Sequence, residues 1–90
     1  MAKIIRAHLS GTWYVKGSIT SDGDRLILTQ AIKVYSSTVK GQWGGATDLA
    51  IVGPSEARVS GEVDVSILAS DAIEVLEVSE AAKLKFDALR

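Results

Sequence analysis

The chain has 90 residues, 47% of them hydrophobic and 23% charged, with a formal net charge of −1 at pH 7. This length suits one domain over residues 1–90, and a domain of that size buries only about 60% of its unfolded surface. The absence of cysteine excludes a disulfide framework and thiol chemistry. Strong nucleic-acid binders usually carry a basic excess, so nucleic acid is an unlikely partner for this chain.

The apolar content is high for so small a domain. With the glycines included, the apolar share exceeds the typical value of about 45–50%. Because a small domain cannot hide all of this surface alone, we expect a homo-oligomer. No stretch has the length of a signal peptide or of a membrane span, so we expect a cytoplasmic protein with no membrane partner.

The first half of the chain predicts strands and a tight hairpin. Residues 3–9 and residues 12–20 alternate between apolar and polar side chains, which is typical of half-buried strands. The SDGD segment at residues 21–24 predicts a hairpin turn, because Asp-Gly readily adopts the positive φ angles of such a turn. A return strand over residues 25–35 follows, with a bend or bulge at residues 29–31.

The faces of the second strand can be assigned from its alternation. One face carries Trp13, Val15 and Ile19. The other face carries Tyr14, Lys16 and Ser18.

The middle of the chain predicts a loop and a short helix. Residues 36–45 are polar and rich in glycine, which indicates a loop or a short strand. Residues 46–52 form one or two helical turns, and Gly53-Pro54 ends them.

The last third predicts two strands and a helix. Residues 62–68 alternate cleanly, and a turn at residues 69–71 leads into a second strand over residues 73–78 as a second hairpin. Ser79 then begins a helix as its N-cap. A longer helix starting at Asp71, with a capping box, is the alternative. The C-terminal helix presents one apolar face, which consists of Ala82, Phe86 and Leu89.

These elements add up to an α+β fold. We expect a small antiparallel β-sheet of about five strands, with one short mid-chain helix and a C-terminal helix.

The sequence does not contain a recognisable catalytic set. His8 is the single histidine, which leaves no triad and no zinc site. Glu62 and Asp64 share a strand face, where they form either a carboxylate pair or ordinary solvated surface. We therefore expect no enzyme activity, no cofactor and no metal.

Charge is distributed unevenly along the chain. Residues 1–45 hold six Lys or Arg and two Asp, whereas residues 46–90 hold four Lys or Arg and nine Asp or Glu. Four of the five aromatic residues also lie in the basic half. An anionic partner for the first half is one explanation, and attraction between the two halves is the other.

One segment combines residues that could hold a small ligand. Trp43 offers a flat surface for stacking, and Gly44 and Gly45 allow a partner to approach the backbone closely. Thr47 could cap the following helix or offer a hydroxyl, and Lys40 supplies charge just upstream. The alternative is a packed tryptophan beside a turn that requires glycine.

Four segments resemble a family of small tailed-phage proteins of unknown function. They read IIRAHLSG, SDGDRLILTQAIKVY, WGGATDLAIVGP and DAIEVLEVSEAAK. The resemblance covers most of the chain, although this sequence has SSTVKGQ between Tyr35 and Trp43, where the family has a shorter spacing. The resemblance implies a phage accessory protein of counter-defence type that acts in the cytoplasm of the host cell.

The resemblance and the residues together predict a sponge for a nucleotide signal. Such a protein binds and sequesters its ligand without catalysis, and it needs only a preorganised pocket. In addition to the glycine-rich segment, we expect Arg6, Lys33 and Tyr35 to contribute to this site. The alternatives are a protein-binding inhibitor or regulator of a host or phage protein, and a minor virion component.

Overall fold

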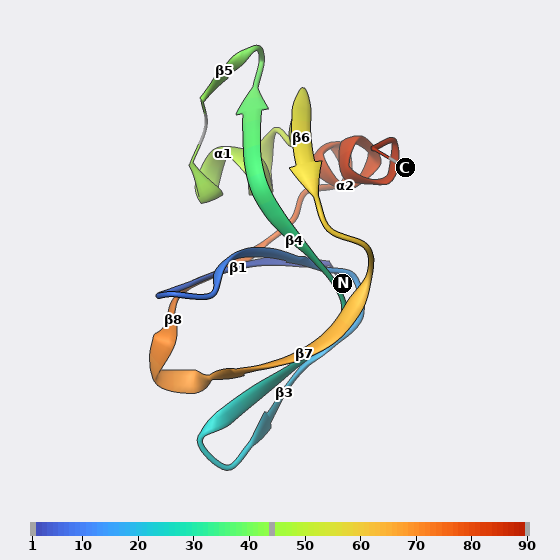
Figure 1. Ribbon diagram of the computed structural model, residues 1–90. Helices are drawn as coiled ribbons and strands as arrows, with labels where there is room; N and C mark the ends of the chain where they lie inside the picture. Colours follow the sequence, from blue (N-terminus) through green and yellow to red (C-terminus); the bar gives the residue numbers. More distant parts are fainter. Residues whose placement is uncertain (1, 44, 90) are drawn as a thin grey trace.

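The computed structural model describes residues 2–43 and 45–89 of the chain. Its strands are β1 (Lys3–Ala7), β2 (Gly11–Val15), β3 (Ile19–Asp22), β4 (Arg25–Val39), β5 (Gln42–Trp43), β6 (Glu56–Val59), β7 (Val63–Leu68) and β8 (Ala72–Glu77). Its helices are α1 (Ala46–Ile51), the 3₁₀ helix η1 (Ala69–Asp71) and α2 (Glu80–Asp87). The predicted α+β fold is confirmed: two helices accompany a curled antiparallel sheet (Figure 1).

The 15-residue strand β4 is the centre of this sheet. It pairs with β3, β2 and β5 along one edge and with β7 and β6 along the other. Its register against β7 shifts between Leu28 and Ala31, and Gln30 between them has a φ of 51°. The predicted bulge is therefore confirmed, and it bends β4 so that the sheet can curl.

The β3–β4 hairpin closes where the sequence predicts it. Asp22 pairs with Arg25, and Gly23 between them has a φ of 62°. The strand that follows is longer than predicted, because β4 continues to Val39 before the turn into β5. The short strand β6, which pairs with this extension of β4, was not predicted from the sequence.

The predicted second hairpin is wrong. The 3₁₀ helix η1 carries the chain away from β7, and β8 pairs with β1 (Figure 1). The chain leaves β7 through η1 and crosses the curled sheet to reach β1 instead of folding back on β7. The alternative of a helix beginning at Asp71 is also wrong, since residues 72–77 form β8.

The sheet buries side chains on both of its faces. Trp13, Val15 and Ile19 share one face of the sheet, as the alternation predicts. Trp13 and Val15 lie in the core inside the curl, and Ile19 packs against this core. Tyr14, which we placed on the opposite, polar face, is completely buried. It is buried because α1 and α2 both cover that face of the sheet (Figure 1), and it belongs to one buried cluster with Leu49 and Phe86.

Local signals place both helices. Gly53 follows α1 with a φ of 87°, and its position agrees with the predicted stop. Ser79 caps α2 as predicted, because its Oγ accepts a hydrogen bond from the Ala82 backbone N–H at 3.1 Å. Within the described residues, neither helix is long and apolar enough to cross a membrane.

Candidate functional site

A shallow hollow of about 260 Å³ lies where β1, β2 and β4 meet the start of α1. The residues that line it include one cation and several hydroxyl groups, and they are Arg6, Thr12, Val34, Tyr35, Ser36, Ser37, Gly45, Ala46 and Leu49. Three residues of the predicted site, Arg6, Tyr35 and Gly45, therefore lie around one depression although they are far apart in the sequence.

Arg6 is the only charged residue among the described residues that line this hollow, and it is held in place from β8. Its Nε donates a hydrogen bond to Glu74 Oε1 at 2.8 Å, and the two side chains are 46% and 34% exposed. In the part of the chain that the structure describes, the terminal nitrogens of the guanidinium have no protein acceptor. They remain able to donate to an anion, and a guanidinium can do so through two parallel bonds.

The hydroxyl residues of the hollow add neutral donors. Thr12 faces Val34 across the β2–β4 ladder, and Ser36 and Ser37 follow on β4. None of these three hydroxyls has a hydrogen-bond partner among residues 2–43 and 45–89. The hollow thus combines one fixed cation with hydroxyl groups that can still donate or accept.

Lys33 and the ring of Tyr35 belong to the other face of the sheet. The Lys33 Nζ lies 5.7 Å from the Tyr35 ring centroid and 5.8 Å from that of Trp13. Side chains alternate along β4, and Val34 between these two residues points toward the helices. Tyr35 therefore borders the hollow, but its ring lies near Lys33 on the other face of the sheet. The residue is 60% exposed.

The remaining predicted residues are spread around the β4–β5 turn and α1. Lys40 is exposed in that turn with a φ of 53°, and Trp43 pairs through its backbone with Thr38. Thr47 is exposed in α1 and does not cap it, because the N-cap is Gly45 and no side chain bonds the free N–H groups. Gly44 lies outside the described residues.

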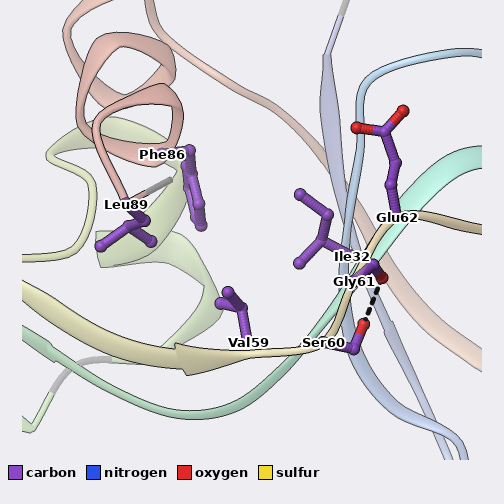
Figure 2. A pocket seen from close by; sticks show the side chains of 7 residues that line it. All are labelled: Ile32, Val59, Ser60, Gly61, Glu62, Phe86 and Leu89. Carbon is purple, nitrogen blue, oxygen red and sulfur yellow. Dashed lines mark hydrogen bonds between the residues drawn. The ribbon is translucent and has the colours of Figure 1, made fainter.

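A second, more apolar pocket of about 320 Å³ was not predicted (Figure 2). Its walls are Ile32, Val59, Phe86 and Leu89, and Ser60, Gly61 and Glu62 form its polar side. Figure 2 shows Phe86 in α2, and Leu89 just after this helix, reaching toward Ile32 and Val59 on the strands. The apolar face of the C-terminal helix was the sequence signal for this pocket, but nothing in the sequence indicated that the loop at residues 60–62 would approach it.

The two carboxylates of the GEVDV segment have structural partners. Glu62 Oε2 lies 2.8 Å from Lys16 Nζ, and Asp64 Oδ1 accepts a hydrogen bond from the Gln30 backbone N–H at 3.0 Å. The bond to Gln30 supports the bulge of β4. Across the described ranges, no group of three His, Cys, Asp or Glu residues is arranged to hold a metal ion.

Comparisons with protein families, with curated proteins and with solved structures find no match to this chain. Its class is therefore defined by its own fold: a small α+β protein built on a curled antiparallel sheet.

Proposed function

We propose that this protein binds and sequesters a small anionic compound of nucleotide type without catalysis. The observation that carries this proposal is the position of Arg6 in the hydroxyl-lined hollow beside α1. A guanidinium that is anchored through one nitrogen and open at its other two is preorganised for a phosphate group.

The size of the hollow limits which part of a nucleotide it would hold. Its volume of about 260 Å³ lies below the roughly 300–1,000 Å³ of most small-molecule sites. We therefore assign it the phosphate and part of the ribose. The base would extend beyond it, where a second copy of the chain would cover it.

The biological part of this proposal depends on the resemblance described above. A phage accessory protein acting in the host cytoplasm would counter a nucleotide-signalled defence by stoichiometric capture, and ADP-ribose derivatives and cyclic oligonucleotides are the chemical classes to test. A homo-oligomer with one anion site per copy would serve this role.

The direct test measures binding of ADP-ribose, of a cyclic dinucleotide and of inorganic phosphate by isothermal titration calorimetry. Changing Arg6 to Gln removes the cation, and we expect the affinity for the phosphorylated ligand that binds to fall about tenfold to a hundredfold, since hydrogen bonds to charged groups contribute about 1.5–3 kcal/mol. Changing Trp43 to Ala tests whether the base stacks there.

Lys3 provides the matched control. It is also a β1 cation bonded to a β8 glutamate, with Lys3 Nζ 3.3 Å from Glu77 Oε1, but it does not line the hollow. Lys3→Gln should change the affinity less than about twofold, because it lowers the net charge equally without touching the site. Equal losses from both variants, or no binding of any probe, would contradict the proposal.

A further inference from the structure

The strand β8 ends the sheet and has an open edge. Among the strands that the structure describes, it pairs only with β1, and the sheet order stops there (Figure 1). The Val78 backbone N–H donates to Ala2 O at 3.2 Å, and the His8 N–H donates to Asp71 O at 2.7 Å. Both bonds indicate that Leu76 and Glu74 direct their backbone groups toward β1, because alternate residues of a strand bond to the same side.

The residues between them therefore direct their backbone groups outward. Val75 and Glu77 present N–H and C=O groups along the open edge that have no partner among residues 2–43 and 45–89, and the register shift at Ile73 marks the start of this regular stretch. Natural edge strands are usually protected by lysine, proline or a bulge. Residues 74–78 contain neither lysine nor proline, so from Glu74 onward this edge remains available for pairing.

The side chains of this edge are apolar or already neutralised. Ile73 is 53% exposed and Val75 is 50% exposed. The two acidic residues are both paired with β1, Glu74 with Arg6 at 2.8 Å and Glu77 with Lys3 at 3.3 Å. Because neither carboxylate lacks a cation, the edge does not favour a basic peptide over a neutral or self-complementary strand.

We propose that β8 pairs antiparallel with β8 of a second copy of this chain, forming a two-fold dimer with a sheet continuous across both subunits. The outward residues must pair with outward residues, so the two-fold axis passes through Val75 or through Leu76. In the first register Glu74 lies opposite Leu76 of the second copy, and in the second it lies opposite Val78. Neither register sets glutamate against glutamate, whereas shifting the axis to Glu74 or Glu77 would.

Self-pairing also extends the existing core. Val75 lies beside Ile5, which is completely buried inside the curl. An added strand would cover the exposed side of Val75 and of Ile73, and would thereby lengthen the apolar layer across the two-fold axis. A second copy supplies the matching apolar residues with no unpaired charge.

The first experiment compares two valine variants by sedimentation equilibrium over a wide range of concentrations. The wild-type chain should sediment at twice its 9.5 kDa mass. Val75→Lys should shift the protein to the monomer, because a lysine on the edge opposes strand pairing. Val63→Lys is the control, since Val63 is 46% exposed on β7 and lies away from the β8 edge, and it should remain dimeric. Circular dichroism verifies that both variants are folded.

The second experiment uses the absence of cysteine in this chain. Single cysteines at position 75 or at position 76 should form an intermolecular disulfide under mild oxidation, and the faster of the two identifies the register. A cysteine at the exposed Thr20 on β3 should not. A monomeric wild-type chain, a Val75→Lys dimer, or equal cross-linking at position 20 would each overturn the proposal. None of these measurements requires a nucleotide, so the dimer and the proposed function can fail separately.

Discussion

The ring of Tyr14 in β2 lies parallel to the ring of Phe86 in α2, with 4.1 Å between their centroids and 7° between their planes. Tyr14 is completely buried and Phe86 is 3% exposed. The two residues are 72 positions apart in the chain, yet this contact attaches the C-terminal helix to the sheet.

Removing the Phe86 ring should destabilise the whole domain. Phe86→Ala deletes a buried aromatic ring that stacks on Tyr14, and such changes typically cost about 3–5 kcal/mol. Urea unfolding followed by circular dichroism measures the loss. Leu84→Ala is the control on the same helix, because Leu84 is 68% exposed and its truncation should cost less than about 0.5 kcal/mol. Similar losses from both variants would contradict the assigned packing of α2.

Replacing Tyr14 by phenylalanine should maintain or increase stability at neutral pH. The Tyr14 hydroxyl is buried and lacks a hydrogen-bond partner among the described residues. Removing an unsatisfied buried hydroxyl while keeping the ring recovers up to about 1–3 kcal/mol. Thermal unfolding of Tyr14→Phe at pH 7 tests this, and a clear loss of stability would show that the hydroxyl has a bonding partner.

The same tyrosine should make stability depend on alkaline pH. Burial, and secondarily the charge of Asp87, raises the pKa of Tyr14 from 10.0 to about 12. Because the folded pKa is the higher one, the stabilisation is fully present below pH 10 and is lost as the pH rises from about 10 to 12, where the unfolded chain ionises first. The free energy of unfolding should fall more steeply over this range in the wild-type protein than in Tyr14→Phe. If the free energy of unfolding fell equally with pH in both proteins, the raised pKa of Tyr14 would be refuted.

Replacing the two glycines that flank α1 by alanine should affect stability to very different extents. Gly53 has a φ of 87°, and a Cβ there would lie 2.8 Å from Ala82 Cα, so Gly53→Ala should cost about 2 kcal/mol or more through strain and contact with α2. Gly45 has a φ of −82° and open space around it, so Gly45→Ala should change stability by no more than about 0.5 kcal/mol. Denaturant midpoints of the two variants test this. A Gly53→Ala variant with an unchanged denaturant midpoint would contradict the close approach of α1 to α2.

Removing the Ser79 side chain should weaken the junction of the two helices. Its Oγ accepts from the Ala82 N–H and donates to Ile51 O at 2.6 Å, so it caps α2 and also satisfies a carbonyl of α1. Ser79→Ala should cost about 1–2 kcal/mol. Ser70→Ala in η1 is the control, since Ser70 is exposed. Thermal unfolding measures both variants. A loss of stability in Ser79→Ala alone would confirm that this hydroxyl both caps α2 and bonds α1, and equal losses of stability would refute it.

The sequence by itself determined the features that depend on neighbouring residues. The Asp-Gly turn, the bulge near Gln30, the stop at Gly53 and the cap at Ser79 were all predictable. Each is decided within a few residues, by the φ angle that a glycine allows or by a hydroxyl near a free N–H.

Only the tertiary structure decided which distant segments meet. Nothing local could indicate that β8 pairs with β1 rather than β7, or that Tyr14 is buried beneath helices instead of lying on a polar face. The same holds for Arg6, whose partner Glu74 is 68 residues away. Such contacts depend on how the whole chain buries apolar surface on both faces of a curled sheet. Interactions between residues that are close in sequence do not determine this arrangement.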